Sequence, residues 1–326
     1  MTTTLPATAD LLSSTETLVR PRYEGSNICS WIGFKHVNYL VEEAVLDYFR
    51  QSGLPSRKLY EQHALGLDLV VLNTRIAHAF HLDDLARATV TFKDVSGGEL
   101  VLAVTIEVDR ESGPVRAVTS TVRVQLRVAA GSGPASPPPS AVSDLVTDHI
   151  TRDAGPVDAR RALPLTVAEL AAEGNAVVWR SRIPYFYCHF TERLQMSGYL
   201  RLMEEAVDVF LAERGASIKT LLDEQNWIPV VPHSNVTILD EALMEETIYT
   251  LFTVEQVFKR ATYTARLDWF VERDGRLVRT ATGQITHGYA VILDRSDWTL
   301  VDFDDRLYHA VSRPSGRRVL SGDDLA

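Results

Sequence analysis

The segment LVEEAVLDYFRQSG, residues Leu40–Gly53, occurs a second time as LMEEAVDVFLAERG, residues Leu202–Gly215. With an offset of 162 residues, the Glu-Glu-Ala-Val stretches coincide, and so do the closing glycines. Apolar residues recur at three- and four-residue spacing in both copies, and Gly53 and Pro55 end the first run, so the pattern predicts one amphipathic helix per copy. Self-similarity at a fixed offset indicates an internal duplication of the 326-residue chain.

Each predicted helix is followed by runs rich in Val, Thr and Ile, which are typical of strands. In the first copy these runs are 68–79, 88–94, 100–108 and 115–128, and in the second they are 228–239, 247–258, 262–272 and 277–293. A long helix followed by a meander of long strands predicts an α+β fold in which a sheet wraps around the helix. Residues 129–143 are rich in Gly, Pro and Ser and predict a linker.

We therefore expect five parts along the chain. They are an N-terminal extension at 1–20, a first unit at 21–128, a linker at 129–175, a second unit at 176–310, and a C-terminal tail at 311–326. The linker contains a predicted short helix at 165–172. The pair Glu42-Glu43 recurs as Glu204-Glu205, which we interpret as the solvated or interface face of each helix rather than as paired catalytic carboxylates.

Composition excludes several classes of function. The chain carries 33 Lys plus Arg against 43 Asp plus Glu, a formal charge of -10, which argues against a nucleic-acid partner. The first nineteen residues contain no Lys or Arg, and no apolar run reaches the roughly 18 residues of a membrane span, so we expect no membrane partner. Two cysteines without a C-x-x-C motif signal neither a disulfide framework nor structural zinc, and they favour the cytoplasm.

The helix segments HVNYLVEEAVLDYF and GYLRLMEEAVDVFL, each followed by about four strands, resemble the hot dog fold. Two such units in one polypeptide resemble a double hot dog, over residues 21–128 and 176–293. This resemblance implies action on acyl thioesters of coenzyme A or acyl carrier protein, at sites between the paired units. Hot dog sheets often pair edge to edge, which suggests a homodimer.

Familiar catalytic motifs do not support the common readings. The sequence has no G-x-S-x-G, H-E-x-x-H, P-loop or G-x-G-x-x-G. The stretch GFKHVN, Gly33–Asn38, is similar to the D-x-x-G-H-V-N signature of one thioesterase group, but Ile32 occupies the position of the signature Asp. None of the nine histidines begins the H-x-x-x-G-x-x-x-x-P run of a hot dog dehydratase.

Asymmetry between the copies marks candidate functional residues, because a duplicated chain can keep one working cleft. His36, Asn38, Tyr60 and His63 of the first unit lie opposite residues of different chemistry in the second, namely Gly198, Leu200, Leu222 or Asp223, and Asn226. The segments RPRYEGSNICSWIGFKHVNYLVEEAVLDYF and LYEQHALGLDLVVLNTRI resemble the bifunctional acyltransferase/decarboxylases of leinamycin-type polyketide biosynthesis. That resemblance implies transfer of methylmalonyl from coenzyme A, decarboxylation, and delivery of propionyl to an acyl carrier protein, with no metal or organic cofactor.

In that family a tyrosine is proposed to carry the acyl group, and Tyr60 matches its position. We expect Tyr60 in a loop after Pro55, with His63 as the base that activates the phenol. Donors for the enolate oxygen are expected near His36, from amides at the start of the first helix and from Asn38 or Asn73. The structural alternatives are packing for Tyr60, helix capping for Asn38 and a strand-edge polar group for Asn73. For His36, too, a functional role and a structural one both remain open.

Two other functions remain open from the sequence. One is a thioesterase or dehydratase acting on a polyketide acyl thioester, which the residue at position 32 disfavours. The other is a catalytically silent module that binds thioesters. The fold alone does not choose between them.

Overall fold

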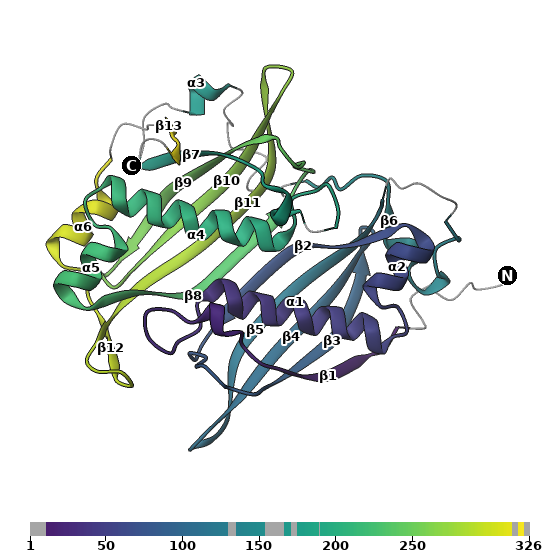
Figure 1. The fold of residues 1–326 in the computed structure, drawn as a ribbon, viewed down its shortest axis with the longest axis horizontal. Helices are drawn as coiled ribbons and strands as arrows, with labels where there is room; N and C mark the ends of the chain where they lie inside the picture. The colour runs from purple at the N-terminus through teal and green to yellow at the C-terminus, as the bar shows by residue number, and fades with distance from the viewer. Residues whose placement is uncertain are drawn as a thin grey trace.

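A computed structural model describes residues 11–129, 135–153, 166–170, 175–188, 190–314 and 319–322. Its strands form one sheet in the order β1-β3-β4-β5-β2-β8-β11-β10-β9-β7-β13, with two long helices across one face (Figure 1). Among these residues no helix has both the length and the hydropathy of a membrane span.

The two units contain the same elements in the same order. The first consists of β1 (Ser14–Val19), η2 (Tyr23–Gly25), α1 (Phe34–Gln51), α2 (Ser56–His63), β2 (Leu65–Ile76), β3 (Ala86–Ser96), β4 (Glu99–Arg110) and β5 (Gly113–Val128). The second consists of β7 (Ala176–Arg182), η4 (Tyr185–Tyr187), α4 (Met196–Glu213), α5 (Ile218–Gln225), β8 (Trp227–Ile238), β9 (Thr247–Phe258), β10 (Thr262–Arg273) and β11 (Arg276–Ile292). The offset of 162 residues therefore relates elements of structure as well as letters of sequence.

Further elements lie outside the repeat. They are η3 (Ser140–Leu145), β6 (Val146–Thr147), α3 (Val167–Leu170), β12 (Trp298–Val301), α6 (Asp305–Ser312) and β13 (Val319–Leu320). Residues 319–320, which we expected in a tail, pair with β7, and α3 covers the described part of the short helix expected at 165–172.

Helices α1 and α4 form where the apolar periodicity predicts them. The buried stripe of α1 includes Val41, Val45 and Phe49, and that of α4 includes Val207 and Phe210. These side chains belong to one cluster of buried apolar residues that continues from the first unit into the second. The two units therefore share a core.

Two first-unit elements differ from the sequence-based expectation. Residues 14–19, assigned to an extension, form β1, which pairs with β3 and is the equivalent of β7. Tyr60, expected in a loop, lies in α2, which Pro55 precedes as the N-cap residue. Both elements are short: α2 buries Leu59, and β1 buries only Thr15 and Val19, so neither has enough periodicity to stand out.

Strands β2 and β8 join the units into a continuous sheet. They pair antiparallel, with Asn73 directly opposite Asn235, its own equivalent in the other unit. Above the sheet, Arg201 Nε donates to the Tyr39 hydroxyl oxygen over 3.1 Å, and these two residues are also equivalents. Both pairs mark an internal pseudo-two-fold axis. Lys35 of α1 forms an ion pair with Glu204 of α4, so the repeated Glu-Glu motif does reach the interface between units.

The interior of the second unit is more polar than that of the first. Tyr263 pairs with His287 in β10–β11, where Leu100 pairs with Val124 in β4–β5. The ring of His287 stacks on that of Tyr263, with 5.3 Å between the ring centroids, and neither ring nitrogen has a hydrogen-bond partner among the described residues. Complete burial lowers the pKa of His287 to about 3, because the charged imidazolium would lose its hydration.

This burial predicts an acid-sensitive stability. Below pH about 6.5 the unfolded chain takes up a proton at His287 that the folded protein refuses, so the free energy of unfolding falls by up to about 1.4 kcal/mol per pH unit. The loss continues down to pH about 3, the folded value. The place of His287 is taken by Val124 in the first unit. His287→Val should therefore flatten the decline of the melting temperature between pH about 6 and 4. An unchanged slope would contradict a neutral buried His287.

Candidate functional site

The pseudo-two-fold axis relates two ends of the unit interface, one at the start of α1 and the other at the start of α4. The backbone around both ends is the same. Ile32 N donates to Phe80 O over 2.9 Å, and Leu194 N donates to Ala242 O over 2.8 Å. The backbones of Trp31 and His81 form an isolated antiparallel β-bridge, and those of Arg193 and Leu243 form the equivalent one. Differences in side chains between the ends therefore occur on one shared framework.

The α1 end is filled with apolar side chains. Trp31 packs with Ile228 and Ala290, and the ring of Trp298 meets that of Trp31 edge-on at 4.2 Å between centroids. Partly buried residues complete this apolar plug: Cys29, Ala79, Leu222, Val230 and Ile292. A small pocket opens beside it, between His81 and the turn at 294–297.

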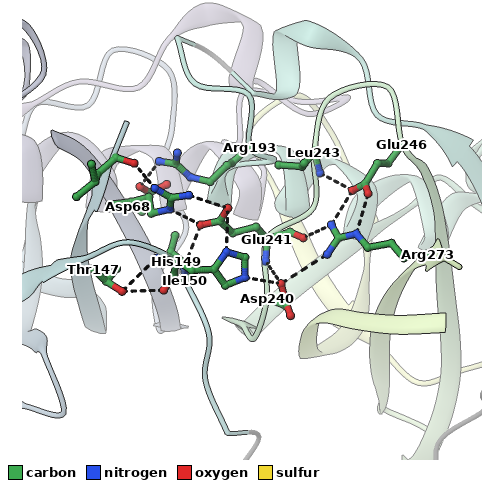
Figure 2. Close-up of polar contacts among 12 residues, drawn as sticks. Asp68, Thr147, His149, Ile150, Arg193, Asp240, Glu241, Leu243, Glu246 and Arg273 are labelled. Carbon is green, nitrogen blue, oxygen red and sulfur yellow. Dashed lines mark hydrogen bonds and ion pairs between the residues drawn. The ribbon is translucent and has the colours of Figure 1, made fainter. Parts of the chain in front are cut away.

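The α4 end places charges at the same positions. At the α4 end, the offset of 162 residues places Gly66 where the α1 end has Ile228, and Asp68 where it has Val230. It likewise places Glu241 where the α1 end has Ala79, and Arg193 where it has Trp31. Arg127 pairs with Gly66 across β2–β5, as Ala290 pairs with Ile228 across β8–β11. Figure 2 shows the resulting network of ion pairs, which connects β2 to the segments before α4 and after β8.

Two ion pairs in this network cross between the units. Arg193 Nη2 donates to Asp68 Oδ2 over 2.7 Å, and both residues are buried. Burial raises the pKa of Asp68 despite the opposing effect of the Arg193 guanidinium. Arg127 Nε donates to Glu241 Oε1 over 2.5 Å, and Ile150 N donates to the same oxygen over 2.9 Å. Although burial raises the pKa of Glu241, these donors outweigh it and the net shift is downward.

The network continues outward along the second unit. His149 lies within 3.0 Å of Asp240 Oδ1 and 3.4 Å of Glu241 Oε2, measured from its two ring nitrogens. Arg273 binds both carboxylate oxygens of Glu246 over 2.9 Å (Figure 2). Among the described residues, no group of three or more His, Cys, Asp or Glu side chains is arranged to hold a metal ion.

Tyr60 lies at this charged end. It projects from α2 of the first unit, is 37% exposed, and its ring meets that of Phe190 at 4.8 Å between centroids. Phe190 belongs to the segment that leads into α4 of the second unit, so the contact crosses the unit boundary. The equivalent of Tyr60 at the α1 end is Leu222, part of the apolar plug.

His63 follows Tyr60 by one helical turn. Its Nδ1 donates to the Pro137 carbonyl oxygen over 2.7 Å, which leaves Nε2 as the basic nitrogen of a neutral ring. No hydrogen bond joins His63 to Tyr60 among the described contacts. The nearby thiol of Cys188 is buried, which raises its pKa to about 11 and keeps it protonated at neutral pH.

The other three predicted site residues lie away from Tyr60. His36 occupies the first turn of α1, where Nε2 lies 3.4 Å from Glu24 Oε1 and its ring meets that of Tyr39 edge-on. Burial, reinforced by the Lys35 ammonium, lowers the pKa of His36. Helix α1 has 18 residues and is therefore about 27 Å long. His36 lies at the start of α1, whereas α2 follows the end of α1 (Figure 1).

Asn38 and Asn73 lie near the unit boundary. Asn38 is 1% exposed, and its Nδ2 donates to Phe34 O over 3.0 Å and to Ser234 Oγ over 3.2 Å, the latter across the boundary. Its Oδ1 has no hydrogen-bond partner. Asn73 Oδ1 accepts from His233 Nε2 over 2.8 Å on the exposed side of β2. The five predicted residues therefore do not form one cluster, and the long helix that follows Phe190 in the chain is α4 rather than α1.

Sequence reasoning missed Asp68, Arg127, Arg193, Glu241 and Phe190. A comparison of the copies at the fixed offset contains the signal, since Arg193 falls on Trp31 and Asp68 on Val230. Each of these residues is unremarkable in its own copy, so only the difference between equivalent positions distinguishes it.

Comparisons with known proteins identify the fold. No protein-family model matches the sequence, and no curated protein matches it in sequence. The structure is similar to that of an oleoyl thioesterase from Lactobacillus plantarum, with a TM-score of 0.59, 12% identity, and coverage of 85% of this chain and 96% of that one. It is also similar to the 12:0-ACP thioesterase from Umbellularia californica, with a TM-score of 0.58, 11% identity, and coverage of 88% and 94%.

A third similar structure is an acyl-ACP thioesterase from Bacteroides thetaiotaomicron, with a TM-score of 0.50, 9% identity, and coverage of 84% and 98%. Identities this low establish architecture and not activity. The chain has a double hot dog fold, as the sequence predicted.

Proposed function

We propose that the protein is an acyltransferase/decarboxylase that takes a methylmalonyl group from coenzyme A and delivers propionyl to an acyl carrier protein. One observation carries this proposal. Of two pseudo-symmetric ends on one framework, the α1 end is filled by an apolar plug, and the α4 end holds Tyr60 against Phe190, three residues before Arg193 of the charged network. Tyr60, whose hydroxyl can accept an acyl group, thus lies where the first unit contacts the segment that leads into α4 of the second unit.

In the proposed reaction, the Tyr60 oxygen attacks the thioester carbonyl carbon. The C–S bond breaks, coenzyme A leaves as its thiol with the phenolic proton, and an ester to Tyr60 remains. Attack by the carrier thiol later forms the new thioester and returns the proton to Tyr60. We assign to His63 Nε2 the role of proton acceptor, because its Nδ1 is occupied by the Pro137 carbonyl.

Loss of CO2 breaks the bond between the carboxylate carbon and C2 and leaves an enolate, which takes a proton at C2 to become propionyl. The acyl carbonyl itself accepts the electron pair, so the chemistry requires neither metal nor organic cofactor. Donors aimed at the enolate oxygen lower the barrier. We assign this role to the first amides of α4, whose N-cap residue Gln195 makes no side-chain capping bond.

Thioester hydrolysis is the second candidate. The similar structures include thioesterases acting on acyl carrier protein substrates, which favours this chemistry over dehydration. In this case water would replace the carrier thiol and the product would be a free acid. A silent thioester-binding module is the third reading. It predicts binding without turnover.

Intact-protein mass spectrometry distinguishes these functions. We expect that mixing the protein with methylmalonyl-CoA and a holo carrier protein adds a propionyl group to the carrier and releases CO2. A carrier modified with methylmalonyl would show transfer without decarboxylation and would contradict the second half of the proposal. Free acid with an unmodified carrier would identify a thioesterase. Intact methylmalonyl-CoA would reject the proposed reaction.

The proposal includes a cytoplasmic location, where coenzyme A thioesters and carrier proteins are available. The homodimer also stays a prediction. Strand β1 lies at one edge of the sheet, with Leu18 60% exposed, and edge strands of this kind offer unpaired backbone groups to a second copy.

A further inference from the structure

Arg193 connects three parts of the charged end. Its backbone bridges to Leu243 in the segment after β8, and Thr191 Oγ1 contacts both its N–H and its carbonyl oxygen. Its guanidinium reaches across the unit boundary to Asp68 in β2 (Figure 2). The segment that Arg193 anchors in this way also carries Phe190, the residue against which Tyr60 packs.

The first unit is shaped to receive this guanidinium. A Cβ atom at position 66 would lie 2.9 Å from Arg193 Nη2 and 3.4 Å from Asp68 Oδ2, and Gly66 avoids both contacts. The equivalent position in β8 is Ile228, which packs in the apolar plug. Gly66 and Asp68 are therefore a matched pair of residues that admit one arginine.

The fold itself does not require this ion pair. At the α1 end the equivalent segment, with equivalent backbone hydrogen bonds, has the apolar residues Trp31 and Val230 at the positions of Arg193 and Asp68. A buried ion pair costs desolvation energy that apolar packing avoids, so it is a poor choice for stability alone. Its directional bond does fix the position of a segment more narrowly than apolar contact does.

We propose that Arg193 is a positioning residue, which uses its bond to Asp68 to hold Phe190 against Tyr60 across the unit boundary. The inference rests on the proposed function at the α4 end. Arg193 acts through the segment 188–195 and does not itself touch the acyl group. The ion pair thereby makes the geometry of the site depend on how the two units fit together.

A double-mutant cycle tests the proposal. We expect Asp68→Asn and Arg193→Gln each to lower kcat by up to about 100-fold, the cost of a displacement near 1 Å, with KM for methylmalonyl-CoA changed much less. Because both act through one contact, the double variant should lose no more than the worse single variant. Arg193→Lys should recover little, since an ammonium lacks the planar geometry. Additive losses, or a wild-type kcat in the single variants, would overturn the proposal.

Hydrogen exchange separates this proposal from the proposed function. In Asp68→Asn and Arg193→Gln, amides of residues 188–195 should exchange faster than in the wild type, whether or not the protein transfers acyl groups. Glu204→Gln is the matched control, because it breaks the Lys35–Glu204 ion pair between the same two units and should leave that segment unchanged. Unchanged exchange in the two pair variants would refute positioning, and absent transfer by the wild type would refute only the function.

A further variant guards against simple unfolding. Gly66→Ile, Asp68→Val and Arg193→Trp together introduce the residues of the apolar plug, which the same framework tolerates at its other end. We expect this triple variant to fold, as judged by its cooperative melting, and to transfer acyl groups up to about 100-fold more slowly, like the single variants. Wild-type kcat in the folded triple variant would contradict a need for the ion pair.

Discussion

Tyr60→Phe should reduce kcat for transfer to the carrier protein by about 10²–10⁴-fold, the range typical of removing a group that bonds to or exchanges protons with the reacting atoms. The change deletes one oxygen atom and keeps the ring. The edge-on contact with Phe190 and the packing of α2 should therefore survive. Melting temperature should stay close to that of the wild type, because the Tyr60 hydroxyl makes no hydrogen bond within the part of the chain that the structure describes.

The measurement compares kcat and KM with the mass of the protein trapped during turnover. Wild type should show an acyl adduct on the peptide that contains Tyr60, and Tyr60→Phe should show none. Tyr23→Phe is a suitable control, because that ring is 82% exposed and lies in the first unit away from the α4 end. Transfer at the wild-type rate by Tyr60→Phe would show that the hydroxyl does not carry the acyl group.

Glu241→Ala should lower the free energy of unfolding by about 1–3 kcal/mol, because it leaves the partly buried guanidinium of Arg127 without its carboxylate partner. The change also removes the acceptor of Ile150 N, which is buried in the same place. Since this ion pair joins β5 of the first unit to the second, its loss weakens the junction between units. Urea denaturation followed by circular dichroism measures the effect.

The pH dependence of the same experiment gives a sign that can be checked. The pKa of Glu241 is lower in the folded protein than in the unfolded chain, so its contribution is present above the unfolded value and is lost as pH falls through the folded value. The difference in the free energy of unfolding between wild type and Glu241→Ala should become smaller as the pH falls. Glu61→Gln, which breaks an exposed pair with Arg57 on α2, should cost less than about 1 kcal/mol at any pH. An equal effect from both substitutions would contradict the role of burial.

Local sequence patterns were enough to predict the helices and most strands. The apolar stripes of α1 and α4 are visible at three- and four-residue spacing because a helix repeats its faces within a few residues. By contrast, α2 exposes most of its length, and β1 has six residues at the sheet edge, so neither leaves a readable period. The sequence therefore predicts a loop at Tyr60, while the mismatch between Tyr60 and Leu222 still marks this residue as a candidate.

The candidate site was predictable only in part, for a different physical reason. Tyr60 and His63 share α2, but His36 lies at the far end of α1, and sequence proximity to the helix did not reveal which end faced the tyrosine. That question depends on the antiparallel pairing of β2 with β8. The pairing brings α2 of the first unit beside the start of α4, and no segment of either unit alone contains that information.

The sequence by itself determined the duplication, the long helices and their strands, and so the double hot dog fold, because these depend on periodicities within one segment. Only the tertiary structure decided that one end of the unit interface is apolar and the other charged. Asp68 and Arg193 are 125 residues apart and belong to different units, and their 2.7 Å contact exists because two strands pair across the boundary. A buried charge is stable only next to an oppositely charged partner, and only the assembled sheet brings these two residues together.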